Sequence, residues 1–171
     1  MRTALVTGGA SWIGAALVTR LRREGFEVRS LDLETGFDVT DPTHWDGVEA
    51  VDVACLNAGV LGGPADPTTL TVDGYRRAMA VNVDGVVLGV RRLGSVMPLG
   101  GRIVCTASLA GLTAVPDDPV YAATRRRASS ASASGYVAPT TGVNSPAAHR
   151  SRSSSAEART RSGRSFMSRP R

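Results

Sequence analysis

A glycine-rich turn near the N-terminus contains residues suited to bind a charged ligand. It reads Thr7-Gly8-Gly9-Ala10-Ser11-Trp12-Ile13-Gly14 and lies between an apolar run at 3–7 and an amphipathic segment at 13–24. Glycines permit a tight turn and close packing of helix on strand, and the helix N-terminus presents free N–H groups and its positive dipole end. The turn predicts a site for the pyrophosphate of a dinucleotide. The alternative is an ordinary strand-to-helix turn.

An acidic residue, Asp32, ends the next strand-like segment at 27–31. A carboxylate at this place can accept hydrogen bonds from both hydroxyls of a ribose, and it repels a 2′-phosphate. Asp32 therefore favours NAD as the cofactor, with NADP the less favoured choice. The alternative is a solvated residue at a strand end.

Alternating strands and helices must position these residues. Strands are predicted at 3–7, 27–31, 51–56 and 102–106, and helices at 13–24 and 74–97. Such alternation implies βαβ units with right-handed crossovers. The predicted fold is therefore α/β, a Rossmann-type doubly wound parallel sheet, incomplete at its C-terminal side.

Length and composition limit the class of protein. The 171 residues suit one domain with a hydrophobic core. No apolar run approaches the roughly 18 residues of a membrane span, and the N-terminus runs directly into the first strand, which leaves no room for a secretory signal. The two cysteines, Cys55 and Cys105, are expected as buried thiols, and His44 and His149 as surface residues, so no metal site is predicted. We expect a cytoplasmic protein.

Further along the chain, four segments join the glycine-rich turn in one pattern. They are Asp38-Val39, Asn57-Ala58-Gly59, Asn82-Val83-Asp84-Gly85, and the pair Ser108 and Tyr121, thirteen residues apart. In this order, residues 1 to about 124 resemble the short-chain dehydrogenase/reductase family. Asp38-Val39 resembles the pair that follows the family's third strand and touches the adenine. The next two segments resemble the family's "NAG" and "NVxG" motifs, and the last pair has the family's Ser–Tyr spacing.

The resemblance implies hydride transfer between a nicotinamide and a small alcohol or carbonyl compound. A tyrosine, whose ordinary pKa is about 10, exchanges a proton at neutral pH only where positive charge stabilises its phenolate. In the family that charge comes from the nicotinamide and a lysine four residues later, while a serine holds the substrate oxygen and an asparagine orders a proton-relay water. Taken singly, the three matching residues could be a strand-end hydroxyl, an interfacial tyrosine and a helix-capping amide.

The resemblance assigns candidate site residues by position. The catalytic positions are Asn82, Ser108, Tyr121 and Arg125. The cofactor-binding positions are Thr7, Gly8, Ser11, Trp12, Ile13, Gly14, Asp32, Asp38, Val39, Asn57, Ala58 and Gly59.

Two of these positions depart from the family pattern. Trp12 stands where this branch of the family usually has glycine, although the extended branch has an aromatic residue there. Arg125 stands where the family has lysine. Arginine keeps a positive charge, but its planar guanidinium does not release a proton. We therefore expect little or no dehydrogenase activity from this chain.

The composition changes abruptly at Arg125. Residues 1–124 have ten arginines and 14 acidic residues, a net charge of −4, whereas 125–171 have ten arginines and one acidic residue. With twelve serines and three residues among Leu, Ile, Val and Phe, this Arg/Ser-rich tail is predicted to be disordered. The expected domains are an NAD-binding domain at 1–124 and the tail at 125–171. The tail is either a shifted reading frame or a genuine extension.

Two other functions stay open. One is a non-catalytic dinucleotide-binding remnant, because the helix that helps to build the family's dimer and its substrate-covering loop have no counterpart after Arg125; a family-typical homo-oligomer would be compromised. The other is nucleic-acid binding by the tail. It is disfavoured because the tail has two aromatic residues, Tyr136 and Phe166, and no recognition-helix pattern. We expect no specific nucleic-acid partner and no membrane partner.

Overall fold

The computed structural model describes residues 1–10, 12–64, 66–113, 115–132 and 136–137. Its strands are β1 (Arg2–Thr7), β2 (Phe26–Leu31), β3 (Val53–Leu56), β4 (Arg102–Cys105) and β5 (Tyr136–Val137). Its α-helices are α1 (Trp12–Arg23), α2 (Pro42–Asp46), α3 (Val72–Met79), α4 (Gly85–Val96) and α5 (Pro119–Ser132). Four shorter helical turns are η1 (Leu33–Thr35), η2 (Pro67–Thr69), η3 (Ala80–Asp84) and η4 (Leu109–Gly111).

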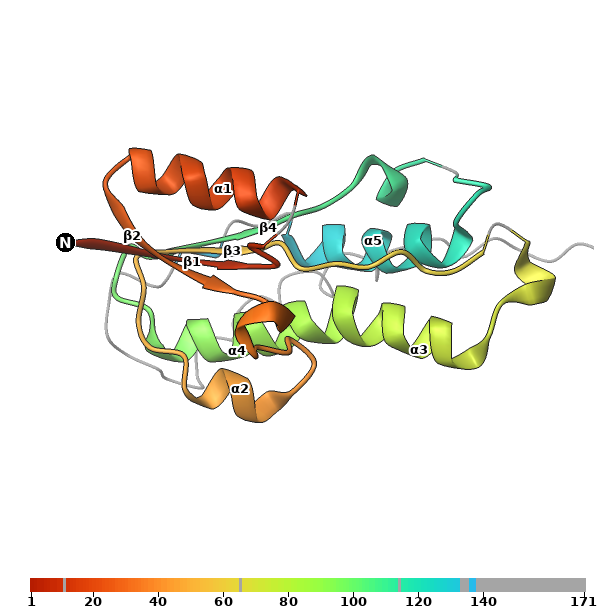
Figure 1. The fold of residues 1–171 in the computed structure, drawn as a ribbon, viewed down its shortest axis with the longest axis horizontal. Coiled ribbons are helices and arrows are strands. Elements are labelled where there is room, and N and C mark those ends of the chain that lie inside the picture. The colour runs from red at the N-terminus through yellow and green to blue at the C-terminus, as the bar shows by residue number, and fades with distance from the viewer. Residues whose placement is uncertain (11, 65, 114, 133–135, 138–171) are drawn as a thin grey trace, which may run out of the picture. The chain divides into compact units, whose positions relative to one another are not determined.

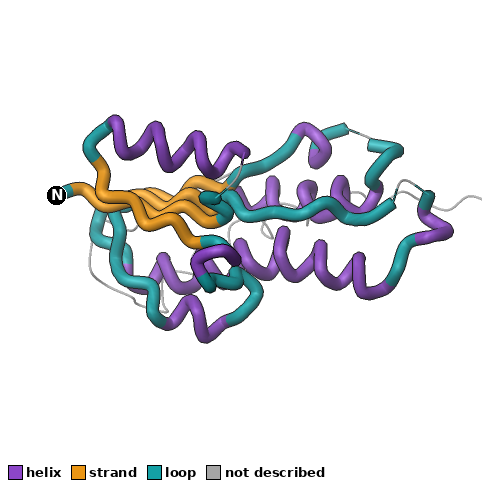
Figure 2. The backbone as a smooth tube through the Cα atoms, viewed as in Figure 1, coloured by secondary structure: helices purple, strands orange, loops and turns teal. Residues whose placement is uncertain are grey.

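The strands form one sheet in the order β2-β1-β3-β4-β5. The first four are parallel, and β5 adds a short antiparallel edge on β4. Helix α1 lies on one side of the sheet, and α2 and α4 lie on the other (Figure 1). Figure 2 shows the strands as the layer between these helices. The predicted α/β fold of the Rossmann type is confirmed.

Each face of the sheet has its own apolar core, because successive side chains of a strand point to opposite faces. Toward α1, the core contains Val6, Val18 and Cys55. Toward α2 and α4, it contains Leu5, Trp45, Val51, Leu56 and Leu93, among other residues.

The two cysteines belong to opposite faces although their strands are neighbours. Cys55 pairs in register with Val104, and Cys105 pairs with Leu56. Cys55 is buried and Cys105 half-buried, and both thiols are free. Burial raises the pKa of both above the ordinary value, with a smaller contribution from Cys105 at Cys55. Both are therefore neutral at physiological pH, as expected.

Two elements differ from the sequence-based expectation. No third strand lies between β2 and Asp38, because β2 leads through the 3-10 turn η1 directly to residues 37–39. The single helix predicted at 74–97 is divided into α3, the π-helical turn η3 and α4. Five residues of wider helix in the middle shift the faces of the two halves relative to each other.

The predicted boundary after residue 124 falls inside α5, which continues to Ser132. Thr124 and Arg125 are both buried, and the residues that follow are helix-compatible alanine, arginine and serine. The expected disorder from Arg125 onward is therefore wrong for the part of the tail within α5. The described residues all belong to one compact unit, which ends at residue 140. The rest of the tail, 133–135 and 138–171, lies outside the described residues.

Within the described ranges, no helix has the length and apolar character needed to cross a membrane.

The close approach of α4 to the sheet generates a first prediction. A Cβ on Gly89 would lie 2.8 Å from Cη2 of Trp45 and 2.9 Å from Cδ2 of Leu56, both in the core. Gly89→Ala is expected to lower the free energy of unfolding by about 1–2 kcal/mol, because overpacking outweighs the better helix propensity of alanine. Urea denaturation measures this change.

Gly47→Ala is the matched control. A Cβ there meets nothing nearer than the His44 carbonyl oxygen at 4.0 Å, and φ is −80°. Its stability should be unchanged or slightly raised. Equal stability of the Gly89→Ala variant and the control would contradict the tight packing of α4.

Candidate functional site

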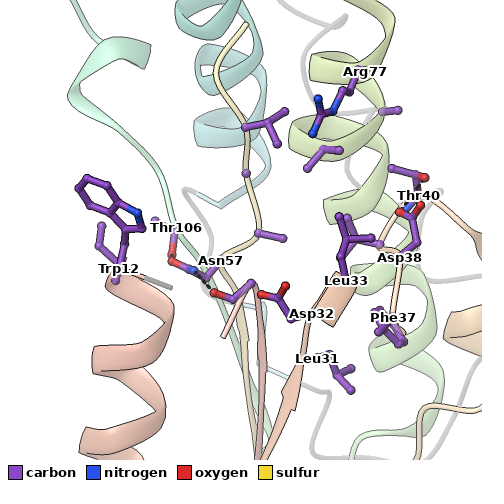
Figure 3. Close-up of a pocket in the computed structure, with 18 of the residues that line it drawn as sticks. Trp12, Leu31, Asp32, Leu33, Phe37, Asp38, Thr40, Asn57, Arg77 and Thr106 are labelled. Atoms are coloured by element: carbon purple, nitrogen blue, oxygen red, sulfur yellow. Dashed lines mark hydrogen bonds between the residues drawn. The ribbon is translucent and has the colours of Figure 1, made fainter. Parts of the chain in front are cut away.

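A cavity of about 570 Å³ opens at the carboxyl ends of the parallel strands. Its wall includes residues that follow β1, β2, β3 and β4: Gly8, 31–33, 57–60 and 106–108. In the strand order, β2 lies on one side of β1 and β3 on the other, so the chain connections run in opposite directions from β1. Open α/β sheets bind ligands at such a point, and the cavity lies there. Figure 3 shows Trp12, Asp32, Asn57 and Thr106 around this edge.

The turns after β1 and β3 form one floor of the cavity. The Thr7 hydroxyl accepts hydrogen bonds from the backbone N–H groups of Asn57 (2.9 Å) and Ala58 (3.1 Å). Gly8, at φ 65°, leaves no space for a side chain, since a Cβ would lie 2.9 Å from Cα of Ala58. A Cβ on Gly14 would lie 1.9 Å from the Gly8 carbonyl oxygen. The floor is therefore backbone, which suits the close approach of a diphosphate.

Trp12 begins α1 beside this floor. Its φ is 50°, the left-handed region that glycine tolerates and a residue with a Cβ disfavours. Its indole lines the cavity and is 92% exposed, so it does not fill the floor. Ile13 also lines the cavity, and Ser11 lies outside the described residues.

Asp32 joins the glycine-rich turn to the end of β2. One carboxylate oxygen accepts from the Ala10 N–H (3.1 Å) and the other from the Glu34 N–H (3.4 Å). The side chain lines the cavity, and each oxygen retains acceptor capacity beyond these bonds. The residue can therefore accept hydrogen bonds from a ribose.

Residues Asp38 and Val39 form another part of the wall, and α2 supports them. The Asp38 N–H donates to Nδ1 of His44 (2.8 Å), and Nε1 of Trp45 donates to the Val39 carbonyl oxygen (2.9 Å). The Asp38 carboxylate accepts from the Thr40 N–H and hydroxyl, each at 2.8 Å. His44 was expected at the surface, and its side chain is 36% exposed. The ring is not simply solvated, however, because it accepts the hydrogen bond from the Asp38 N–H.

Asn82 lies in the π-helical turn η3 and is fully buried. Its Oδ1 accepts from the Val60 N–H (2.8 Å), and its Nδ2 donates to the Val60 carbonyl oxygen (2.9 Å) and to Oγ1 of Thr124 (3.0 Å). Both amide hydrogens are thus used within the protein. In this geometry Asn82 positions the loop after β3 against α5 and donates to no water.

Ser108 and Tyr121 both line the cavity. The Ser108 hydroxyl accepts from the Ala110 N–H (3.2 Å) and caps η4. The Arg125 guanidinium lies 5.0 Å from the centre of the Tyr121 ring, and its Nη1 donates to the Thr106 carbonyl oxygen (3.2 Å). Only 5% of Arg125 is exposed. The arginine thus places a positive charge beside the phenol, where the family resemblance implies a lysine.

Gly59 makes room for this arginine. A Cβ on Gly59 would lie 1.9 Å from Nη2 of Arg125 and 3.3 Å from Oδ1 of Asn82. The remaining candidate in this region, Asn57, accepts from the Thr106 hydroxyl (2.9 Å) and donates to the Gly8 carbonyl oxygen (3.4 Å). These two hydrogen bonds join the turn after β4 to the turns after β3 and β1.

Sequence reasoning missed two residues. Asp118 is 9% exposed; its carboxylate accepts from the Gly62 N–H and from the Tyr121 N–H, both at 2.8 Å. The Asp-Pro pair that opens α5 is an N-cap signal that could have indicated it. Arg77 lines the cavity from α3, on the side of Asp38 and Thr40 (Figure 3). No local signal distinguishes it from Arg76.

Comparisons with known proteins agree with this architecture. The model of the family described as "Enoyl-(Acyl carrier protein) reductase" matches residues 43–142. The 2-(R)-hydroxypropyl-CoM dehydrogenase of Xanthobacter autotrophicus is 32% identical over 153 residues, which cover 70% of this chain and 61% of the relative. The 2-dehydro-3-deoxy-L-rhamnonate dehydrogenase (NAD(+)) of a Sphingomonas species is 29% identical over 150 residues, 72% of this chain and 60% of that protein.

Solved structures show the same fold. A small-chain dehydrogenase, 24% identical, superposes with a TM-score of 0.70 over 76% of this chain and 72% of its own. BdcA, solved in complex with NADPH, is 26% identical with a TM-score of 0.69 over 76% of this chain and 62% of its own. The chain belongs to the short-chain dehydrogenase/reductase family, whose members bind NAD(P). It spans about three fifths of the length of the curated relatives that it matches.

The left-handed backbone at Trp12 generates a second prediction. Trp12→Gly and Trp12→Ala both remove the indole and differ only in the Cβ. Trp12→Gly should be more stable than Trp12→Ala by about 1 kcal/mol, because alanine keeps the unfavourable φ. Urea denaturation of the two variants measures the difference.

Ala16→Gly, at an exposed position within α1, is the control with the opposite sign. It should cost about 0.5–1 kcal/mol, as glycine does inside a helix. A Trp12→Ala variant more stable than Trp12→Gly would show that residue 12 does not adopt the left-handed conformation.

Proposed function

We propose that this chain binds NAD(H) and serves hydride transfer between the nicotinamide and a small alcohol or carbonyl compound. One observation carries the proposal: Asp32, Ser108 and Tyr121 line a single cavity. Its volume, about 570 Å³, lies within the range of small-molecule sites. A ribose acceptor and a proton-transferring pair in one cavity are what such a reaction needs.

The residues that would hold the cofactor surround the backbone floor. Gly8, Asn57, Ala58 and Gly59 line that floor, and Thr7 and Gly14 pack against it. Trp12 and Ile13 belong to the start of α1, next to Ser11 in the sequence. Asp32, Asp38 and Val39 would face the adenosine. The glycines support this assignment most directly, because a Cβ on any of them would meet protein atoms within 3 Å. The helix α1 adds its positive dipole end near the diphosphate.

The bound nicotinamide supplies or accepts the hydride. The Tyr121 phenol would donate a proton to the carbonyl oxygen in reduction and accept it in oxidation. The Ser108 hydroxyl would hydrogen-bond the same oxygen. The Arg125 guanidinium, 5.0 Å from the Tyr121 ring centre, would stabilise the phenolate by its charge. Asn82 would act as a positioning residue through Val60 and Thr124.

Asp32 supports NAD over NADP. Relatives of both kinds exist: one is named for NAD(+), and BdcA was solved with NADPH. In this chain a 2′-phosphate would face the Asp32 carboxylate, and the repulsion would add to the loss of ribose hydrogen bonds. We further propose that the protein acts in the cytoplasm on small molecules, without a specific nucleic-acid or membrane partner.

The third prediction tests this preference by calorimetry. NAD(H) should bind at least about tenfold more tightly than NADP(H), equivalent to about 1.4 kcal/mol. Asp32→Asn should reduce that ratio, because the amide no longer repels the phosphate. Glu34→Gln, which removes a neighbouring charge from η1 outside the cavity wall, is the control and should keep the ratio. Equal affinities in the unmodified protein, or a preference for NADP(H), would refute the role of Asp32.

A second candidate function is dinucleotide binding without turnover. It is favoured by Arg125, whose guanidinium does not exchange a proton as an ammonium can.

The fourth prediction concerns turnover, since only hydride transfer, and not dinucleotide binding alone, would produce it. The unmodified chain should oxidise a simple secondary alcohol slowly or not at all, since one misplaced charged donor typically costs ~10²–10³ in rate. Arg125→Lys alone should restore little, because the residues after Arg125 also do not resemble the substrate-covering loop of the family. Arg126→Lys, one position further along α5 and exposed, controls for the general effect of the exchange. NADH absorbance measures turnover. Robust turnover by the unmodified chain would exclude the non-catalytic function.

A further inference from the structure

Two neighbouring rings of α2 support two neighbouring backbone groups of the cavity wall. Nδ1 of His44 accepts the Asp38 N–H at 2.8 Å, and Nε1 of Trp45 donates to the Val39 carbonyl oxygen at 2.9 Å. Asp38 and Val39 both line the cavity. The place of this wall therefore depends on α2, although α2 contributes no side chain to the cavity lining.

The bond to Asp38 requires a neutral His44. A neutral imidazole has one acceptor nitrogen, and here Nδ1 is that acceptor, so the ring hydrogen is on Nε2. Protonation makes both nitrogens donors, and the Asp38 N–H then faces another N–H. The Trp45 bond has no such dependence, because an indole N–H does not titrate in this range. With 36% of its side chain exposed, His44 can exchange protons with water.

The protonated ring has a second partner within reach. Nε2 of His44 lies 3.7 Å from Oδ2 of Asp41. Hydrogen bonds from Thr43 lower the pKa of Asp41, first through its side chain and then its backbone, so this carboxylate is ionised wherever a histidine titrates. Protonation of His44 therefore removes its hydrogen bond to the Asp38 N–H and, at the same time, creates an attraction between the ring and the Asp41 carboxylate.

Other groups around His44 do not replace Asp41. The Asp38 carboxylate is occupied by the Thr40 N–H and hydroxyl. The Phe37 ring, 5.6 Å away between centres, is uncharged. From α4, which packs against α2, Arg92 donates to the Val48 carbonyl oxygen, beyond the end of α2. From α3, Arg77 lines the cavity on the side of Asp38, and its charge would further disfavour a cation at this wall.

We infer that His44 is a positioning residue that makes dinucleotide binding proton-dependent. Neutral His44 fixes Asp38 for the adenine side of the ligand; protonated His44 turns to Asp41 and releases Asp38, while Trp45 keeps its bond to Val39. Because the binding-competent wall contains the neutral ring, affinity falls as the pH falls and the ring gains a proton. This inference rests on the proposed NAD(H) site.

The fifth prediction measures NADH affinity of the full chain by calorimetry between about pH 8 and pH 5.5. The unmodified protein should lose about three- to tenfold in affinity, the equivalent of one hydrogen bond. His44→Asn, whose Oδ1 can accept the Asp38 N–H without titrating, should bind tightly with a flat profile. His44→Phe, which keeps a ring beside Phe37 but has no acceptor, should bind weakly with a flat profile.

Two further variants sharpen the test. Asp41→Asn removes the partner of the cation, so the loss of affinity should move to lower pH. His149→Asn removes the other histidine of the chain and should leave the profile unchanged. A flat profile in the unmodified protein, or the same fall in His44→Phe, would overturn the inference.

A measurement without ligand keeps the inference testable if the proposed function fails. In an NMR titration of the unliganded protein, the Asp38 amide should shift in step with the His44 ring, and it should not shift in His44→Asn. The inference is overturned if the chemical shift of the Asp38 amide stays constant while the His44 ring titrates. Absence of NADH binding at every pH, with the amide shift present, refutes the NAD(H) site and leaves the coupling of His44 to Asp38 established.

Discussion

The buried amide of Asn82 is the interaction on which the end of the cavity that contains Tyr121 and Arg125 depends. It satisfies both backbone groups of Val60 and bonds Oγ1 of Thr124, so the loop after β3 and helix α5 have a fixed separation. The π-helical turn η3 allows this, because the extra width turns Asn82 inward between α3 and α4. Since α5 contains Tyr121 and Arg125, Asn82 helps to set their position relative to the backbone floor, although it does not itself line the cavity. The Asp118 carboxylate adds a second link, between Gly62 and Tyr121.

Glycines set the shape of the cavity floor, because they have no side chain where two segments approach each other closely. Gly8 lies against Ala58, Gly14 against the Gly8 carbonyl oxygen, and Gly59 against the Arg125 guanidinium. Hydrogen bonds hold these closely packed segments together. The Thr7 hydroxyl accepts two backbone N–H groups, and the Asp32 carboxylate accepts one N–H from the glycine-rich turn. The part of the cavity near Asp32 and the part near Tyr121 therefore belong to one hydrogen-bonded edge of the sheet, which brings together residues far apart in the chain.

Some features were predictable because their signals are local. Alternating apolar periods predicted the strands and most helices, and the strand–glycine–helix sequence predicted the turn between β1 and α1. Others were not, because they depend on packing. The division of the 74–97 segment at η3 follows from the burial of Asn82, and the continuation of α5 past Thr124 follows from the buried Thr124 and Arg125. Composition at 125–132 predicted disorder because it counts side chains without their neighbours.

The sequence by itself determined the parallel α/β sheet, the turn at 7–14 and the acceptor at Asp32, since each is encoded by adjacent residues and by the period of a single element. Only the tertiary structure decided which groups meet: Asp118 with Gly62 and Tyr121, His44 with Asp38, and Arg125 with the Tyr121 ring. The physical reason is directional. A hydrogen bond or a cation over a ring depends on distances of a few ångströms between segments, and those distances exist only after the helices have packed on the sheet.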